Sequence, residues 1–319
     1  MNEKPSVLIT GAAGYVGRLV TEALAASGDA LGDVVATDVR AVPEGDRVPG
    51  VIYDARDICD DRLADLLRAH RIDTVVHLAS VIRPPAGDDG ALAYRVDVLG
   101  TRNVLDACEA AGVKHFVVTT SGAAYGYHPD NPMWLDEDQP LRGHPSFVYS
   151  RNKKAIEEAL AAHRARRPEM GQLVLRPCTI LGERTRSPIT DLFEKRAIVG
   201  VAGSESPFVF VWDHDVVACI VRGVLEQRTG IFNLAGDGAM SPREIARRLG
   251  KPYLALPPRL LTGALAMLRR LHLTQFGPEQ VDFLRYRPVL SNRRLKQEFF
   301  TPQKTSLEAF EVWKNARNS

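Results

Sequence analysis

The chain has 319 residues, 45% of them hydrophobic, so it can form a substantial core in one large domain or two closely joined ones. Its net charge of +2 is too balanced to predict a nucleic acid or an anionic membrane as a partner. The four cysteines lie far apart without metal-ligand spacing, and the polar N-terminus does not resemble a signal peptide. We therefore expect a cytoplasmic protein with reduced thiols and no metal site.

The first predicted strand, residues 6–10, runs straight into a glycine-rich turn and a helix. Gly11 permits a tight turn, Gly14 lets the backbone approach phosphates, and Gly17 lets the helix pack closely on the strand. A second predicted strand ends in Asp38, at the distance expected of an acid that binds an adenosine ribose. This combination predicts a dinucleotide cofactor.

The first half of the chain alternates short β-branched runs with helical patterns, which predicts a Rossmann-type, doubly wound parallel sheet with helices on both faces. The predicted strands are residues 6–10, 33–38, 51–53, 74–78, 116–120 and 173–175. The predicted helices are residues 15–27, 62–71, 91–111 and 148–166.

The sequence pattern changes after Arg176-Pro177, where prolines and glycines become frequent and the predicted strands become shorter. We divide the chain into a dinucleotide-binding domain, 1–176, and a substrate-binding region, 177–319, of which segments such as 231–234 return to the main sheet. An apolar stretch, Leu254 to Leu268, is interrupted by proline, glycine and Arg259 and is too short to span a bilayer. It is consistent with a helix that covers an apolar pocket or a dimer surface, or with interfacial anchoring.

The segment 149–153 contains the predicted catalytic pair, Tyr149 and Lys153, which project from one face of a helix because they are four residues apart. A nearby ammonium stabilises a phenolate, so Tyr149 could exchange a proton with an alcohol or ketone while hydride moves to or from a nicotinamide. Ser121 follows the fifth predicted strand, at the edge where parallel sheets bind ligands, and could donate a hydrogen bond to the reacting oxygen.

These motifs together resemble the extended short-chain dehydrogenase/reductases, in the branch of NAD-dependent epimerases/dehydratases that includes UDP-glucose 4-epimerase. The matching motifs, in chain order, are Thr10-Gly11-x-x-Gly14-x-x-Gly17, Asp54-x-x-Asp57, His77-Leu78-Ala79, Gly100-Thr101-x-Asn103-Val104, Ser121 with Tyr125-Gly126, Tyr149-x-x-x-Lys153 and Arg176-Pro177.

The resemblance implies an NAD-dependent oxidoreductase and a homodimer formed through the helices 91–111 and 148–166. The expected cofactor site comprises Gly11, Gly14, Tyr15, Val16, Gly17, Asp38, Asp54, Ala55, Leu78, Ala79, Ser80, Tyr149, Lys153, Pro177 and Ile180. The acid at Asp38 favours NAD over NADP because it repels a 2′-phosphate, although Arg40 keeps NADP open.

The chain departs from two subgroups of the family. Gly122-Ala123 stands where nucleotide-sugar dehydratases carry an Asp-Glu pair, which disfavours a dehydratase. Ser206 stands where nucleotide-sugar 4-epimerases carry a phosphate-binding arginine, and aromatic residues follow it. Another arginine could take over this role; the candidates are Arg184, Arg186, Arg285 and Arg287.

We therefore expect an oxidoreductase that transfers hydride between NAD and a mainly apolar secondary alcohol or ketone, with Ser121, Tyr149 and Lys153 as catalytic residues. The alternative is a nucleotide-sugar 4-epimerase that recycles a bound NAD. A catalytically silent dinucleotide sensor is disfavoured because such a protein has no use for all three residues.

Overall fold

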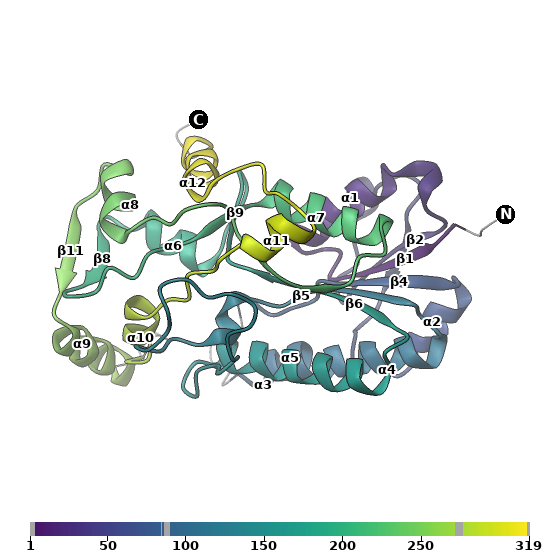
Figure 1. Ribbon diagram of the computed structural model, residues 1–319, viewed down its shortest axis with the longest axis horizontal. Coiled ribbons are helices and arrows are strands. Elements are labelled where there is room, and N and C mark those ends of the chain that lie inside the picture. Colours follow the sequence, from purple (N-terminus) through teal and green to yellow (C-terminus); the bar gives the residue numbers. More distant parts are fainter. Residues whose placement is uncertain (1–3, 84, 86–89, 272–276, 318–319) are drawn as a thin grey trace.

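The computed structural model describes residues 4–83, 85, 90–271 and 277–317, and its centre is a seven-stranded sheet (Figure 1). The strand order is β10-β6-β5-β4-β1-β2-β3, and every neighbouring pair is parallel. The strands are β1 (Ser6–Thr10), β2 (Val34–Asp38), β3 (Ile52–Ala55), β4 (Ile72–His77), β5 (His115–Thr119), β6 (Gly171–Pro177) and β10 (Gly230–Leu234). This topology confirms the predicted doubly wound parallel sheet.

Helices cover both faces of the sheet because its strands are apolar on both sides. Figure 1 shows α1 and α7 on one face and α2, α4 and α5 on the other. These helices are α1 (Tyr15–Ala25), α2 (Leu63–Ala69), α4 (Thr101–Ala111), α5 (Val148–Arg166) and α7 (Asp213–Leu225). The predicted helix 91–111 consists of α3 (Ala91–Tyr94), a π-helical turn (Arg95–Gly100) and α4.

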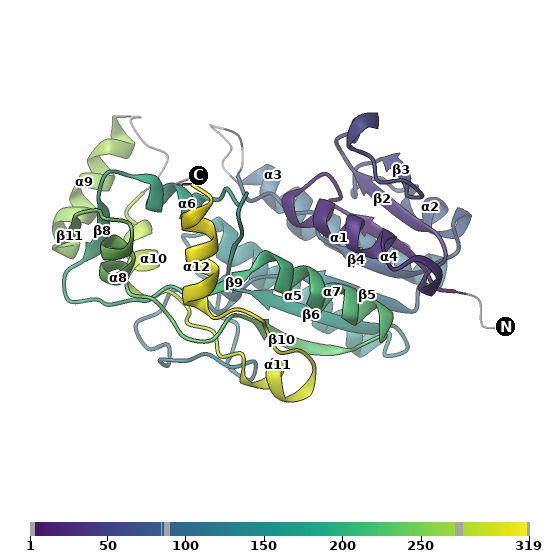
Figure 2. The ribbon, with the colours of Figure 1, turned by 90° about the horizontal axis from the view of Figure 1, so that it is seen from above.

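The chain after residue 177 builds a second layer of structure at one end of the molecule (Figure 2). Two short parallel pairs form there, β7 (Thr179–Leu181) with β9 (Phe210–Trp212) and β8 (Ile198–Val201) with β11 (Tyr253–Leu256). The helices of this part are α6 (Pro188–Glu194), α8 (Pro242–Arg248), α9 (Pro258–Arg270), α10 (Gln280–Arg285) and α12 (Ser306–Asn315). One more helix, α11 (Arg293–Glu298), contacts β10 and packs on the main sheet. Because β10 pairs with β6, this part of the chain also contributes the edge strand of the main sheet.

No helix among the described residues is long and apolar enough to cross a membrane.

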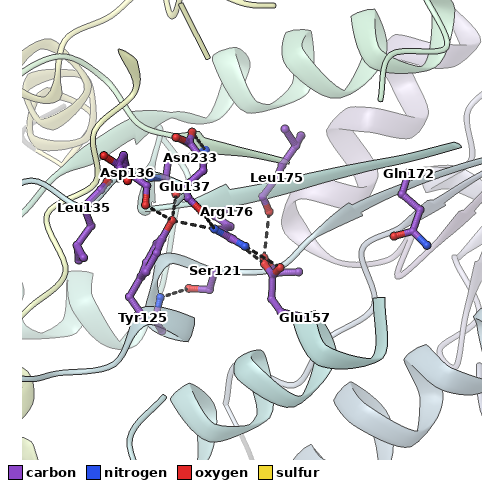
Figure 3. Close-up of polar contacts among 12 residues, drawn as sticks. Ser121, Tyr125, Leu135, Asp136, Glu137, Glu157, Gln172, Leu175, Arg176 and Asn233 are labelled. Atoms are coloured by element: carbon purple, nitrogen blue, oxygen red, sulfur yellow. Dashed lines mark hydrogen bonds and ion pairs between the residues drawn. The ribbon is translucent and has the colours of Figure 1, made fainter. Parts of the chain in front are cut away.

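A buried ion pair joins α5 to the sheet (Figure 3). The Arg176 guanidinium, at the end of β6, donates to both carboxylate oxygens of Glu157 on α5, at 2.9 and 3.0 Å. Glu157 also accepts a hydrogen bond from the Thr120 hydroxyl at 2.6 Å. Both charged side chains are at most 5% exposed, so their charges are compensated by each other and not by water.

The remaining Arg176 nitrogen extends this network to the edge strand and the loop after β5. It donates to the Tyr125 hydroxyl at 2.9 Å, and that hydroxyl lies 2.9 Å from Oδ1 of Asn233 on β10. Burial alone would lower the pKa of the Arg176 guanidinium, but the hydrogen bonds to Glu157 raise it above its ordinary value. The arginine is therefore permanently charged and needs the carboxylate.

His77, at the end of β4, forms a second buried link. Its Nδ1 lies 2.7 Å from the Thr10 hydroxyl and its Nε2 3.0 Å from the Thr101 hydroxyl. Because Thr101 donates its own proton to the Asp97 carbonyl, it accepts from Nε2, and Nδ1 accepts from Thr10. Burial, with a smaller contribution from the positive Lys153, lowers the pKa of His77 to about 3.

Replacing Glu157 with glutamine is expected to lower the free energy of unfolding by about 3–5 kcal/mol, because it leaves the Arg176 charge buried without a partner. Glu158→Gln is the matched control, since Glu158 is 62% exposed and pairs with Lys154 at the surface. Its expected cost is below about 1 kcal/mol. Urea denaturation of both variants measures the difference, and equal effects would contradict the structural role of the pair.

The stability of the protein is expected to fall below pH 6.5 because His77 stays neutral when folded, whereas the unfolded chain takes up the proton near its ordinary pKa of 6.5. The contribution of His77 is fully present above that pH and is lost towards pH 3, at up to about 1.4 kcal/mol per pH unit. His77→Gln should flatten this part of the profile, measured by urea denaturation between pH 7 and 5. His70→Gln, at a partly exposed position near Asp33, is the control for the loss of a histidine elsewhere in the chain.

Candidate active site

The glycine turn between β1 and α1 leaves room for backbone and for little else. Gly11 has a φ of +73°, and a Cβ there would lie 2.6 Å from the Ala79 amide nitrogen. A Cβ on Gly17 would lie 2.1 Å from the Gly11 carbonyl oxygen. The turn is therefore limited to glycine at both positions, as expected where a helix N-terminus and its backbone amides approach a phosphate.

Asp38, at the end of β2, lies directly beside this turn. Its carboxylate accepts a hydrogen bond from the Ala13 amide at 3.1 Å and another from the Arg40 amide at 3.0 Å. A small hollow continues from it, lined by Ala36, Asp38, Arg40, Ala41, Val42, Arg47, Tyr53, Asp54 and Ala55. The residues predicted for the adenosine end, Asp38, Asp54 and Ala55, thus line one hollow.

Asp54 and Tyr15 have partners that the sequence did not indicate. The Asp54 carboxylate is bound by the Arg56 guanidinium at 3.0 and 3.3 Å. The Tyr15 hydroxyl donates to the carboxylate of Asp213, the first residue of α7. Burial and this hydrogen bond raise the pKa of Tyr15 to about 12, so it stays protonated and joins the first turns of α1 and α7. Val16, the next residue, packs against the core on that face.

Tyr149 and Lys153 lie in the first turns of α5, with the Lys153 ammonium 5.3 Å from the centre of the Tyr149 ring. Lys153 is 3% exposed and donates to the Ser80 hydroxyl at 3.0 Å. Ser80 follows Leu78 and Ala79 in the segment after β4, all three of which were expected to line the cofactor. The structure therefore brings the predicted lysine and one predicted cofactor-lining residue into direct contact.

Ser121 is held close to the start of α5 by its neighbours. Its hydroxyl oxygen caps the short helical turn 122–125 by accepting from the Ala123 amide at 3.1 Å (Figure 3). The carbonyl of Ala123 in turn accepts from the Ser150 hydroxyl at 2.6 Å, and Ser150 directly follows Tyr149. The Ser121 O–H is left to donate elsewhere, from the carboxyl end of β5.

The end of β6 and the segment after it contain two residues that were expected in the cofactor site, Pro177 and Ile180. Pro177 is the last residue of β6, and Ile180 lies in β7, where it packs against the core beside α7. Burial raises the pKa of the Cys178 thiol between them, so this thiol is neutral and fills space.

Arg287 contacts Ser206, the residue that stands where nucleotide-sugar 4-epimerases were expected to carry an arginine. Its backbone amide donates to the Ser206 hydroxyl and its guanidinium to the Ser206 carbonyl, both at 2.9 Å. The guanidinium carbon lies 3.4 Å from the ring centre of Phe208 and 4.8 Å from that of Phe283. Burial lowers the pKa of Arg287 to about 9, which leaves it positively charged at neutral pH.

An aromatic group extends from Arg287 to the beginning of α5. The centre of the Tyr127 ring lies 5.1 Å from that of Phe147 and 5.3 Å from that of Phe283. The rings of Phe147 and Phe283 stack with their centres 5.9 Å apart. Phe147 immediately precedes α5, two residues before Tyr149. We call Tyr127, Phe147, Phe208 and Phe283 the aromatic wall. The nearby His128 donates to the Gly143 carbonyl at 2.7 Å, which gives it a role in the loop.

Comparison with known proteins agrees with this geometry. A part of the chain, residues 7–234, matches the model of the NAD dependent epimerase/dehydratase family. The chain is 34% identical over 194 residues, 60% of its length and 54% of the relative's, to N-acetyl-alpha-D-glucosaminyl-diphospho-ditrans,octacis-undecaprenol 4-epimerase of Escherichia coli O157:H7. It is 28% identical to sterol demethylase protein B of Methylococcus capsulatus, over 89% of this chain and 87% of that protein.

A solved structure of Thermus thermophilus UDP-glucose 4-epimerase, in complex with NAD, has the same fold. The two superpose with a TM-score of 0.74 over 98% of this chain and 99% of that one, at 24% identity. The family match covers all three predicted catalytic residues and most of the described chain. The protein belongs to the NAD dependent epimerase/dehydratase family.

Proposed function

We propose that the protein is an NAD-dependent oxidoreductase that interconverts a secondary alcohol and a ketone of mainly apolar character. The observation that carries the proposal is the position of Tyr149. Its ring lies beside the buried Lys153 ammonium, and one hydrogen bond from the next residue, Ser150, ties it to the turn that Ser121 caps. A proton carrier, a positive charge and an O–H donor thus meet at the carboxyl edge of the sheet.

NAD is the cofactor that fits the cradle. The glycine turn admits no Cβ at Gly11 or Gly17, and the Asp38 carboxylate would meet the ribose hydroxyls and repel a 2′-phosphate. When bound, NAD supplies the hydride acceptor or donor. The neighbour from Thermus thermophilus, whose structure was solved with NAD, supports this assignment.

The chain's own residues handle the proton. A Tyr149 phenolate beside the Lys153 ammonium can accept the proton of a substrate hydroxyl, and in the reverse direction the phenol returns it. The Ser121 O–H would donate to the same substrate oxygen and stabilise the charge that develops there. Lys153 is fixed by its bond to Ser80, so its charge is already in place before the substrate arrives.

The apolar character of the substrate follows from the aromatic wall next to Tyr149. Tyr127, Phe147 and Phe283 contact one another, and Phe208 and Phe283 contact Arg287. Phe147 and Phe283 are half-buried, so a group that enters on this side would meet carbon. The similarity to sterol demethylase protein B, which spans most of both chains, supports such a substrate class. A ring system with a secondary hydroxyl has the required chemistry.

Tyr149→Phe is expected to lower turnover by about 10²- to 10⁴-fold, because it removes the proton carrier and keeps the ring. NAD affinity should stay within a factor of about two, since the contacts of the glycine turn and Asp38 are unchanged. Steady-state assays with cyclic secondary alcohols and fluorescence titration with NADH provide the two readouts. Tyr94→Phe, at an exposed position, is the matched control with full activity. An active Tyr149→Phe enzyme would refute the mechanism.

The second candidate function is a nucleotide-sugar 4-epimerase, which Arg287 favours. The arginine supplies a positive charge beside Ser206, so the loss of the family's arginine there does not leave the region neutral. An epimerase needs no net oxidant, because a bound NAD would take up the hydride and return it to the same carbon, while Tyr149 would accept and then return the hydroxyl proton.

Native mass spectrometry of the protein as purified separates the two functions. One NAD per subunit that survives dialysis, with saturable UDP binding, would favour the epimerase. Arg287→Gln should then weaken UDP binding by about tenfold or more, and the surface variant Arg293→Gln should not. An empty protein that binds added NAD reversibly and ignores UDP would favour the dehydrogenase.

A further inference from the structure

Helix α9 exposes its apolar side chains instead of burying them. Among its 13 residues none is buried, although the helix is rich in leucine. The exposed fractions are 58% for Leu260, 65% for Met267, 40% for Leu268 and 54% for Leu271 just beyond its end. In α12, by contrast, Phe310 and Trp313 are at most 1% exposed. The C-terminal part of the chain therefore buries the large apolar side chains of α12 but leaves those of α9 exposed.

The exposed residues form a continuous stripe. With about 3.6 residues per turn, positions 260, 264, 267, 268 and 271 fall on one side of the helix. Pro258, Leu261 and Leu265, which are partly buried, fall on the side that faces the protein. The helix thus has one broad apolar face, of which the part formed by Pro258, Leu261 and Leu265 is partly buried and the adjoining part is turned to solvent. We call these five positions the α9 stripe.

Every charged residue of α9 is an arginine, although Arg269 pairs with Glu279 after the helix, and Arg247 and Arg248 before it pair with Glu244. Arg259 and Arg270 are exposed and lie about three turns apart, so they share one line along the flank of the stripe. No aspartate or glutamate occurs in the sequence between Glu244 and Glu279, whereas this segment contains Arg247, Arg248, Lys251, Arg259, Arg269 and Arg270. The balanced charge of the whole chain hides this local excess.

We propose that α9 binds the surface of an anionic lipid bilayer, with the stripe among the acyl chains and Arg259 and Arg270 at the headgroups. A helix of 13 residues is about 20 Å long, shorter than the hydrocarbon core, so it would lie in the interface and not cross it. Leu254 and its register partner Val199, 47% and 38% exposed, lie at the same end of the molecule in both views (Figures 1 and 2).

A second copy of the chain fits the stripe less well than a bilayer does. In an antiparallel pairing of two α9 helices about a twofold axis, Arg259 would face Arg270 of the other copy. The helix has no acidic residue to compensate these charges, so the pairing would bring like charges together. The homodimer expected from the family resemblance would use α4 and α5, and would leave α9 uncovered.

The test is flotation of the full-length protein with vesicles. We expect binding to vesicles of phosphatidylcholine with 30% phosphatidylglycerol and little binding to phosphatidylcholine alone, with affinity falling as salt is added. Met267→Gln/Leu271→Gln should weaken binding about tenfold or more, because two side chains leave the acyl region. Arg259→Gln/Arg270→Gln should weaken it about 25-fold, at about fivefold for each arginine.

Matched controls are Leu225→Gln, an exposed leucine at the end of α7, and Arg102→Gln/Arg293→Gln, which removes the same charge elsewhere. Both should bind like the wild type, and all variants should keep the wild-type circular dichroism spectrum and NAD titration. Failure of the wild type to float would overturn the proposal, as would equal losses in α9 variants and controls. Stripe variants that turn a dimer into a monomer, without vesicle binding by the wild type, would assign the stripe to a second copy instead.

Discussion

The candidate active site depends on the buried positive charge of Arg176, which must be paired inside the protein. Arg176 is the penultimate residue of β6, the strand beside the edge strand β10, and it stays charged because both carboxylate oxygens of Glu157 accept hydrogen bonds from it. Glu157 lies on α5 one turn after Lys153, so satisfying the arginine fixes the helix that carries Lys153 and Tyr149. The remaining guanidinium nitrogen of Arg176 donates to the Tyr125 hydroxyl, which lies within hydrogen-bond distance of Asn233. These contacts hold the loop after β5 against the edge strand β10. One pair of buried charges thus ties together the elements that carry Tyr149, Lys153 and Ser121, the proposed catalytic residues.

Much of this arrangement could be predicted from the sequence. The helix 148–166 agrees with α5, and the parallel sheet follows from β-branched runs that are apolar on both faces. Side-chain contacts between residues that are far apart in the chain could not be predicted. Nothing local indicates that Arg287 would reach Ser206, or that the Tyr15 hydroxyl would bind Asp213. The π-helical turn in the helix 91–111 is a further example, because propensity cannot distinguish it from regular helix.

The apolar segment around α9 shows a different limit. Its composition left a pocket cover, a dimer surface and interfacial anchoring open, since all three need the same leucines. Only the structure shows which part of the apolar face the protein covers, and that the adjoining part remains in solvent. Periodicity identifies apolar faces, but it cannot count how many of them the rest of the chain will cover.

The aromatic wall and the α9 stripe are connected through α10. This helix packs against α9, and its Phe283 stacks on Phe147 and contacts Arg287. The exposed stripe therefore lies a helix away from the apolar side of the proposed active site. If α9 rests on a bilayer, a substrate with a large apolar part would reach the proposed active site within one helix of the lipid surface. Such a substrate explains both apolar surfaces at once, whereas a free nucleotide sugar explains neither. The two proposals rest on different residues, and the position of α10 between these residues makes the proposals mutually consistent.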